Sequence, residues 1–369
     1  MAVMQPREKL SAILSGHLVA QAVSVATRLG IPDLVADRPQ RADVLARATR
    51  SHPEELYRLL RALASAGIFA EKRQQRFGRT PLSDLLRRGV PGSLREVAIL
   101  GGEPWRRASY GLAGSLRAGR PAFEAMFGMP LYSYLAKHPR SLRLFTEVMA
   151  YHWSQLGGPV LSVLDCSGTR RIVDVGGGPG SLMQILLEAH SGVTGVVFDL
   201  SVVAAATRRR LAAAGLSPRC RVVAGNFFRG VPRGGDLYIL AFVLHNWDDR
   251  NAMRILKRCR EAMSETARLV VIEMLVPTNT RPAAAKIHDL EMLVFTSGRD
   301  RTAAEYRALL RATGLRLRRI VATRTAVSLM EAVRIRRPPH PSLHSKPRTS
   351  SKGVQREFKA RSETLRDAG

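Results

Sequence analysis

The chain has 369 residues, of which 45% are hydrophobic and 24% charged, and a formal net charge of +28. This composition predicts a globular protein with room for two domains and a large core. It excludes several classes: no continuous apolar run reaches the roughly 18–20 residues of a membrane span, and the N-terminus lacks the apolar centre of a secretion signal. The three cysteines are widely spaced without a metal-ligand pattern, so we expect reduced thiols, a cytoplasmic protein and no bound metal.

The positive charge raises the question of a nucleic-acid partner. The arginines before residue 336 are dispersed, often in pairs such as Arg106 with Arg107 and Arg318 with Arg319. Dispersed arginines are typical of a solvated surface, which argues against a nucleic-acid groove. Residues 336–369 are rich in Pro, Ser, Lys and Arg and poor in apolar residues. We expect them to form a basic, disordered tail.

The first half of the chain is predicted to be almost entirely helical. Its Ala- and Val-rich first helix stops before Gly30-Ile-Pro, and the order helix, helix, hairpin that follows is typical of a winged helix. The expected elements are helices over 10–28, 41–50, 53–66, 81–88, 93–118 and 131–155, a hairpin over 67–80, and a Gly/Pro-rich link over 119–130.

The second half alternates between strand and helix patterns. Such alternation predicts an α/β fold, a Rossmann-like, doubly wound sheet of seven strands with helices on both faces. The last two strands are joined by a short turn, so the last strand should be antiparallel. We place a helical, winged-helix-like domain at 1–165, an α/β domain at 166–335 and the tail at 336–369. The expected strands cover 171–176, 194–199, 220–225, 235–244, 268–274, 315–324 and 327–334, and the helices 181–190, 201–214, 249–264, 285–296 and 302–313.

A glycine-rich turn follows the first of these strands. The apolar run Ile172 to Val175 ends in Gly176, Gly177, Gly178 and Gly180, and a helical pattern comes next. A strand, a glycine turn and a helix together present backbone N–H groups to a ligand. The plain alternative is an ordinary strand-to-helix turn.

The next strand ends on Asp199, which lies 19 residues beyond Gly180. A ribose-binding acid falls at about this distance in nucleotide-binding βαβ units. The glycine spacing G-x-G-x-G differs from the dinucleotide fingerprint and suits S-adenosylmethionine, which has a ribose but no pyrophosphate. We therefore expect a nucleoside-type cofactor.

Several ordered motifs make residues 12–335 resemble the S-adenosylmethionine-dependent O-methyltransferases of the caffeic-acid and hydroxyindole type, especially bacterial enzymes that methylate aromatic polyketides or carotenoid alcohols. The resemblance implies a small hydroxylated acceptor, and a homodimer in which the N-terminal domain serves dimerisation and lines the substrate pocket. We expect the 10–28 and 53–66 helices to form the dimer contact. The motifs are Asp174-Val-Gly-Gly-Gly-Pro-Gly, Phe198-Asp-Leu, Gly225-Asn-Phe-Phe, Val231-Pro-Arg-Gly-Gly-Asp236, Leu244-His-Asn-Trp-Asp-Asp249 and Arg299-Asp-Arg-Thr302.

The resemblance also implies roles for individual residues. His245 would be the general base, oriented by the acids Glu273 and Glu305. For Glu305 an equally good interpretation is the acid of a capping box with Thr302. The implied cofactor-binding residues are Asp174, Gly176, Gly178, Gly180, Asp199, Leu200, Asn226 and Phe227, and the implied substrate-pocket residues are Phe145, Met149, Trp247 and Met292.

Two positions depart from the family pattern. Asn226 stands where an Asp usually faces the adenine, and its amide oxygen can still accept a hydrogen bond, without charge assistance. Asn246 stands beside His245 where many relatives carry Asp, which removes a negative charge and should lower the pKa of the histidine. Two other functions stay open: a DNA-binding regulator that uses the winged helix, and a methyltransferase-fold enzyme with other chemistry, such as hydroxylation.

Overall fold

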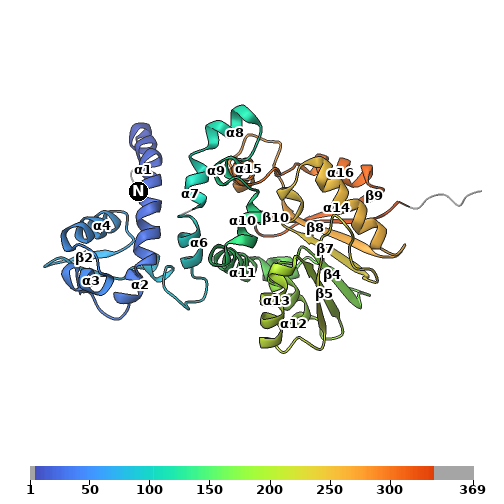
Figure 1. Cartoon of the computed structure of the whole chain (residues 1–369), viewed down its shortest axis with the longest axis horizontal. Coiled ribbons are helices and arrows are strands. Elements are labelled where there is room, and N and C mark those ends of the chain that lie inside the picture. Colours follow the sequence, from blue (N-terminus) through green and yellow to red (C-terminus); the bar gives the residue numbers. More distant parts are fainter. Residues whose placement is uncertain (1–4, 103, 336–369) are drawn as a thin grey trace, which may run out of the picture. The chain divides into compact units, whose positions relative to one another are not determined.

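The computed structural model describes residues 5–102 and 104–335. A seven-stranded sheet dominates the second half of the chain (Figure 1). Its strand order is β6-β5-β4-β7-β8-β10-β9, and β4 to β8 pair in parallel. The last strand, β10, lies between β8 and β9 and is antiparallel to both, as expected for a strand that follows a short turn. The strands are β4 (Arg171–Val175), β5 (Thr194–Asp199), β6 (Cys220–Ala224), β7 (Leu237–Ala241), β8 (Arg268–Met274), β9 (Leu315–Ala322) and β10 (Val327–Arg334).

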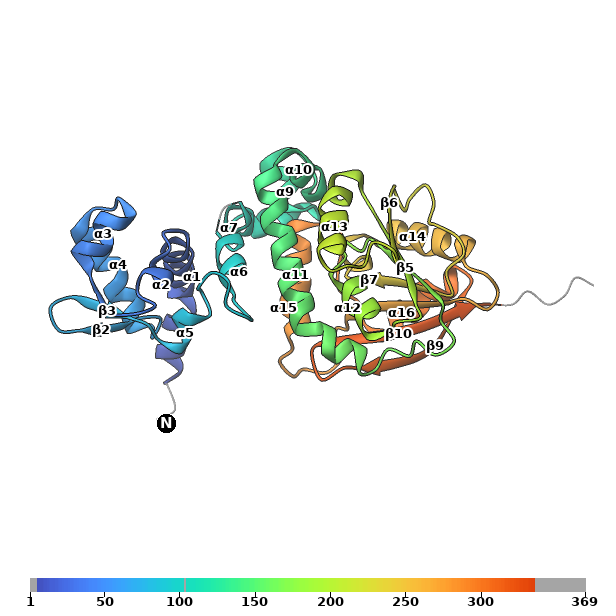
Figure 2. The same ribbon diagram turned by 90° about the horizontal axis from the view of Figure 1, so that it is seen from below.

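Helices cover both faces of this sheet, so the side chains of its central strands are buried on both sides. One core cluster joins one face to α14 (Asp249–Ala262) and α16 (Ala303–Ala312). A second cluster joins the other face to α11 (Pro139–Leu161), α12 (Ser181–Ala189) and α13 (Ser201–Ala213), and Figure 2 shows α11 beside α12. The predicted α/β architecture is therefore confirmed.

The N-terminal module is a separate arrangement of short elements around its own core. Leu45, Leu60, Phe69 and Phe77 are almost completely buried in it. The predicted hairpin forms, and a short strand adds to it, so the small sheet has the order β1-β3-β2. The elements are α1 (Pro6–Arg28), α2 (Ile31–Leu34), β1 (Gln40–Arg41), α3 (Ala42–Thr49), α4 (Pro53–Ser65), β2 (Ala70–Lys72), β3 (Arg76–Gly78) and α5 (Pro81–Asp84).

The prediction of two long helices between the module and the sheet is wrong, because each of them is divided into shorter helices. The 93–118 stretch is divided into α6 (Arg95–Leu100), α7 (Trp105–Ser109) and α8 (Leu112–Ala118), with glycines and Pro104 at the breaks. Pro139 divides the 131–155 stretch, since the residue before a proline avoids the helical region, giving α10 (Leu131–Lys137) and α11. The supposed link contains the helix α9 (Ala122–Phe127), and α15 (Ala284–Phe295) packs against α7, α8 and α9.

Helix α1 carries an exposed apolar face. Leu10, Ile13, Leu14 and Leu18 are each more than half exposed, and α1 is long and apolar enough to cross a membrane by length and composition. Sequence analysis looked for a continuous apolar run and did not detect this property, because Ser, His and Gln interrupt the apolar residues of α1. The apolar residues of α4 are instead buried inside the module, so α4 does not offer the second exposed apolar face that the sequence suggested.

Residues 1–335 group into one compact unit. The boundary predicted at residue 165 therefore stays a prediction, and the predicted tail, 336–369, lies outside the described residues.

Candidate active site

The glycine turn after β4 is closely packed on one side and open on the other. Gly176 has a positive φ of 76°, and a Cβ added there would lie 2.8 Å from Cγ2 of Val243, on the segment that follows β7. Gly178 also has a positive φ, of 54°, but its Cβ would meet nothing within 4 Å. A side chain at Gly176 would separate the two loops, whereas the space at Gly178 leaves room for a ligand to approach the backbone.

Two carboxylates lie under this turn. Asp199 accepts the N–H of Gly178 at 2.7 Å and the N–H of Leu200 at 2.6 Å. Asp174 is fully buried, and neither of its carboxylate oxygens has a hydrogen-bond partner. Burial, followed by the charge of Asp199, raises the pKa of Asp174 to about 7. A buried carboxyl group without a partner is costly, so this one indicates that a bound polar or cationic group completes the site.

The other predicted cofactor residues lie around the same edge of the sheet. Gly180 is the N-cap residue of α12, and Leu200 is the N-cap residue of α13. Asn226 uses Oδ1 to accept the N–H of Phe228 at 2.9 Å, which leaves one lone pair of that oxygen for a ligand. The ring of Phe227 packs against Trp247 with centroids 5.9 Å apart. Asp174 without a partner, the open space beside Gly178 and these donors and acceptors together fit a nucleoside that carries an amino-acid group.

His245 lies just beyond β7, in a single 3-10 turn from Leu244 to Asn246. Its Nδ1 is 2.8 Å from Oε2 of Glu273 and 3.8 Å from Oδ1 of Asp300. The Glu273 contact has an ion-pair distance, but its angles are not those of an aligned hydrogen bond. A carboxylate only accepts, so it holds the proton on Nδ1 and leaves the lone pair on Nε2. Nε2 is thus the atom that can remove a proton.

Glu273 also fixes the backbone that carries the histidine. This residue is fully buried at the end of β8. Its Oε1 accepts the N–H of Leu244 at 2.9 Å and that of His245 at 3.3 Å. Asn246 donates to the carbonyls of Phe242 and Val243, a role that an ionised Asp could not perform. The departure from the family pattern at Asn246 therefore has a local structural reason.

Arg301 clamps the same turn from the other side. Its guanidinium is fully buried and donates to the carbonyls of Leu244 and Trp247 at 3.0 and 2.7 Å, and to Asp249 at 2.9 Å. Gly298 lies directly against the turn, because a Cβ there would be 1.9 Å from the carbonyl oxygen of His245. The segment 298–301 therefore determines where His245 lies, a role that sequence analysis did not assign.

Glu305 does not join this group. It accepts the N–H and the hydroxyl of Thr302 at 2.8 and 2.9 Å, and Thr302 caps the helix in return. Its other oxygen pairs with Arg299 at 2.7 Å. The capping-box interpretation therefore describes Glu305, while the acids near His245 are Glu273 and Asp300. The motif Arg299-Asp-Arg-Thr302 contains Asp300, to which sequence analysis gave no role, and the catalytic role expected for Glu305 stays a prediction.

A second histidine completes the cluster. Nδ1 of His288, on α15, is 2.5 Å from Oδ2 of Asp300, and the rings of His245 and His288 have centroids 5.1 Å apart. Ligand-type atoms of these three residues lie within 4.8 Å of one another, a spacing that a metal ion could use. Each histidine already faces a carboxylate, so we interpret the group as a network of proton donors and acceptors.

The predicted substrate-pocket residues are aromatic and sulfur side chains. Trp247 stacks on Tyr132 with centroids 6.4 Å apart, and Phe145 meets the same Tyr132 ring edge-on at 6.4 Å. Met292 is buried on α15, and Met149 is half-buried on α11. Sequence analysis missed Tyr132. Burial, followed by the charges of Asp199 and Glu273, raises the pKa of this tyrosine.

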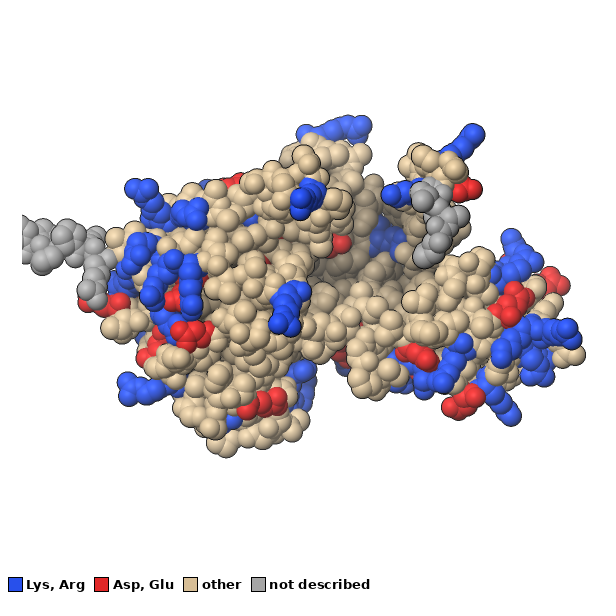
Figure 3. Space-filling view, turned by 180° about the vertical axis from the view of Figure 1, so that it is seen from behind, with Lys and Arg blue, Asp and Glu red and all other residues tan. Residues whose placement is uncertain are grey.

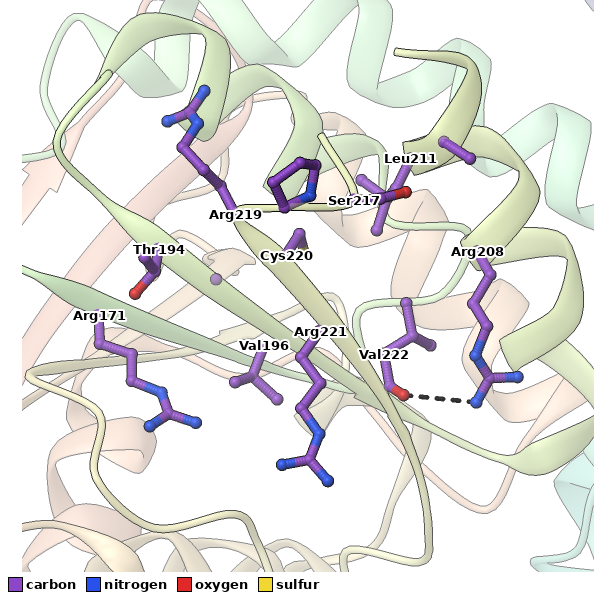
Figure 4. A pocket seen from close by; sticks show the side chains of 13 residues that line it. Arg171, Thr194, Val196, Arg208, Leu211, Ser217, Arg219, Cys220, Arg221 and Val222 are labelled. Carbon is purple, nitrogen blue, oxygen red and sulfur yellow. Dashed lines mark hydrogen bonds between the residues drawn. The ribbon is translucent and has the colours of Figure 1, made fainter. Parts of the chain in front are cut away.

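A hollow of about 600 Å³ lies elsewhere, along β5, β6 and α13 (Figure 4). Arg171, Arg208, Arg219 and Arg221 line it, and no carboxylate does. Arg219 is occupied in donating to backbone carbonyls at the end of α12. This hollow contains none of the predicted site residues. On the face seen in Figure 3, Lys and Arg are scattered and mixed with Asp and Glu.

Comparison with known proteins gives two family matches. The O-methyltransferase domain matches residues 109–316, and the O-methyltransferase dimerisation domain matches residues 11–89. The chain is 40% identical to the phenazine O-methyltransferase PhzM of Lysobacter antibioticus, over 87% of this chain and 94% of that protein. It is 37% identical to the 8-amino-8-demethylriboflavin N,N-dimethyltransferase of Streptomyces davaonensis, over 80% and 86%.

Solved structures agree with these matches. The structure of LaPhzM superposes with a TM-score of 0.87 at 39% identity, over 90% of this chain and all of that one. NcsB1, an O-methyltransferase from neocarzinostatin biosynthesis, was solved with S-adenosylmethionine and 2-hydroxy-5-methyl naphthoic acid. It superposes with a TM-score of 0.77 at 33% identity, over 85% of this chain and 95% of that one.

Proposed function

The chain belongs to the family of S-adenosylmethionine-dependent O-methyltransferases, and from this premise we propose that it methylates a hydroxyl of a small aromatic acceptor with His245 as general base. The observation that carries the proposal is the pairing of His245 Nδ1 with the buried Glu273 at 2.8 Å. When bound, S-adenosylmethionine supplies a methyl group on a positively charged sulfur. The residues around the acceptor must orient its hydroxyl and remove the hydroxyl proton.

The acceptor needs help because a phenol has a pKa near 10. It is protonated at pH 7 and is then a weak nucleophile. Nε2 of His245 takes the hydroxyl proton as the oxygen bonds to the methyl carbon. Glu273 and Asp300 then face the imidazolium that forms. Arg301 and Gly298 hold the turn in place, so the histidine is oriented before the acceptor arrives.

The cofactor would be held by the glycine turn and the two acids beneath it. Asp199 has the position of a ribose-binding acid, and Asp174 lies buried without a partner. Asn226 and Phe227 would meet the adenine. The aromatic group of Phe145, Trp247 and Tyr132, with Met149 and Met292, would enclose the acceptor ring.

A homodimer is expected from the dimerisation domain at residues 11–89. We propose that α1 forms this contact, because its exposed leucines and Ile13 need a partner surface. This interface would also account for the apolar character of α1 without a membrane, and a cytoplasmic location fits it.

N-methylation is the second candidate, since a relative 37% identical to this chain is named an N,N-dimethyltransferase. An amine acceptor has its own lone pair and needs a base less than a phenol does. The His245 and Glu273 pair therefore favours oxygen. Mass spectrometry with labelled S-adenosylmethionine, applied to matched phenols and anilines, would distinguish the two.

The test of the proposal is the variant His245→Ala, with His52→Ala as control. His52 is exposed at the start of α4 and its side chain makes no capping bond. We expect His245→Ala to lower kcat by about 10²–10⁴, with cofactor affinity retained. Raising the pH should partly restore turnover of a phenol, because a phenolate no longer needs the base. Near wild-type turnover of His245→Ala at pH 7 would refute the assignment.

A further inference from the structure

Asp300 lies between two histidines and is almost completely buried. One of its oxygens, Oδ2, meets Nδ1 of His288 at 2.5 Å, and the other, Oδ1, is 3.8 Å from Nδ1 of His245. The backbone N–H of Asp300 donates to Asp289 at 2.8 Å, which fixes the carboxylate from behind. The two imidazole rings therefore converge on one carboxylate through the same type of nitrogen.

This convergence determines which ring edges are free. In both histidines Nδ1 faces a carboxylate, so Nε2 lies on the opposite edge. The His288 side chain is 22% exposed, whereas the Asp300 side chain is not exposed. Nε2 of His288 is not fully buried, so a ligand can reach it. Among the residues the structure describes, none makes a hydrogen bond with Nε2 of His288.

His288 also has the electrostatic setting of a donor. Burial by itself lowers the pKa of His288, but the hydrogen bond and charge of Asp300, followed by Glu291 and Glu273, outweigh it and raise the pKa. Protonated His288 offers an N–H at Nε2. The free edge can thus donate a hydrogen bond to an oxygen of a ligand, and a charged donor favours an anionic oxygen.

Position brings this donor next to the reacting hydroxyl. The ring centroids of His245 and His288 are 5.1 Å apart. Two oxygens on neighbouring carbons of one aromatic ring, each with a hydrogen bond of about 2.8 Å, can span a separation of this order. Helix α15, which carries His288, also supplies Val294 and Phe295 to the aromatic cluster of Phe123 and Phe145. The same helix therefore contributes to both the polar and the apolar sides of the site.

We propose that His288 is a specificity-determining residue that binds a second oxygen-containing group of the acceptor, a hydroxyl or a carboxylate. This group would lie on the ring carbon next to the one that carries the methylated hydroxyl. The inference rests on the proposed function, since it assumes that His245 meets the reacting oxygen. It selects ortho-dihydroxy or ortho-hydroxy-acid aromatic acceptors over simple phenols. A merely structural His288 would join α15 to the loop at Asp300 and would make no such selection.

Two substitutions separate these roles. In His288→Asn the amide nitrogen can replace Nδ1 and keep the bond to Asp300, but the far ring edge is lost. In His288→Gln the longer amide can reach the position of Nε2 at the expense of the Asp300 bond. The acceptors are 2-naphthol, 2,3-dihydroxynaphthalene and 3-hydroxy-2-naphthoic acid, which share one ring system. Calorimetry with the full chain and S-adenosylhomocysteine gives acceptor affinities, and labelled-methyl transfer gives kcat/KM.

We expect wild-type protein to prefer at least one of the two vicinal acceptors over 2-naphthol by about 10-fold or more, as a charged hydrogen bond of about 1.5–3 kcal/mol predicts. His288→Asn should abolish that preference, and His288→Gln should keep part of it. Comparison of 2,3-dihydroxynaphthalene with 3-hydroxy-2-naphthoic acid shows whether a hydroxyl or a carboxylate is favoured next to the methylated hydroxyl.

Equal affinity of wild-type protein for all three acceptors, or an unchanged preference in His288→Asn, would overturn the inference. Loss of binding by the same factor for all three acceptors in His288→Asn would overturn it too, by showing a structural role. Absence of methylated product despite selective acceptor binding would contradict the proposed O-methylation instead, because the affinity ratios do not depend on turnover.

Discussion

The variant Glu273→Gln tests how the base is oriented. Glutamine keeps an oxygen at the position of Oε1, so the N–H groups of Leu244 and His245 retain their acceptor. At the position of Oε2 an NH₂ group would now face Nδ1 of His245. An NH₂ group donates, so it favours the tautomer in which the proton lies on Nε2. The histidine would then point a donor, and no lone pair, at the acceptor hydroxyl.

The size of the effect follows from two losses. The charge-assisted contact to the imidazolium is worth about 1.5–3 kcal/mol, or about 10- to 100-fold in rate. Loss of the base tautomer brings the total towards the 10²–10⁴-fold range of general-base catalysis. We therefore expect kcat to fall by about 10³-fold, with the affinity for S-adenosylhomocysteine unchanged.

Initial rates of labelled-methyl transfer at pH 7 measure the loss, and thermal unfolding checks that the fold persists. Glu331→Gln is the matched control. Glu331 is a buried glutamate on the neighbouring strand, pairs with Arg318 and Arg319, and lies three positions along from Ser328, which faces Glu273. The Glu331→Gln variant should have a lower melting temperature but nearly the same kcat as wild type. A Glu273→Gln variant that keeps kcat within about 3-fold of wild type would refute the tautomer argument.

Three further outcomes are expected. Asp199→Ala should weaken S-adenosylmethionine binding by about 10- to 100-fold, from about 1.5–3 kcal/mol per charged hydrogen bond; undiminished affinity by calorimetry would place the ribose elsewhere. Gly298→Ala should lower both the melting temperature and kcat, because its Cβ would meet the His245 carbonyl, whereas Gly192→Ala, with open space around its Cβ, should change neither. Burial raises the pKa of Asp174 from 3.8 to about 7, so the folded apoprotein binds this proton more tightly than the unfolded chain does. Its contribution to stability is therefore present below pH 4 and is lost as the pH rises towards 7, on the order of 4 kcal/mol. The difference in urea unfolding free energy between wild type and Asp174→Asn should follow that trend, and a difference independent of pH would contradict it.

Sequence patterns predicted the sheet well because strand and helix periods are local. Buried runs such as Ile172 to Val175 and the short turn before Val327 were sufficient to define the strands and the antiparallel end. The same reasoning failed between residues 93 and 155. There, apolar residues have helical spacing through several breaks, and only the local effect of Pro139 and the glycines ends each helix.

The site was predictable where one motif carries one role. His245, Glu273 and Asp199 lie at strand ends, and a motif at the end of a strand indicates the edge where ligands bind. Only the three-dimensional structure shows that Asp300 lies nearer to His245 while Glu305 bonds Thr302, because both acids fall within one short segment. The roles of Tyr132 and His288 depend on contacts between α10, α15 and the loop after β7, which no local pattern encodes.

The clamp formed by Arg301 and Gly298 has a consequence for how this enzyme can be altered. The proposed base His245 is held against the sheet by Glu273 of β8 and by residues 298–301, whereas most of the side chains proposed to enclose the acceptor ring come from α10, α11 and α15. These two sets of residues can change independently, except where His288 and Asp289 of α15 bond to Asp300. Laboratory evolution towards new acceptors should therefore collect its substitutions on these helices and spare the clamp, and natural divergence of acceptor choice would follow the same division.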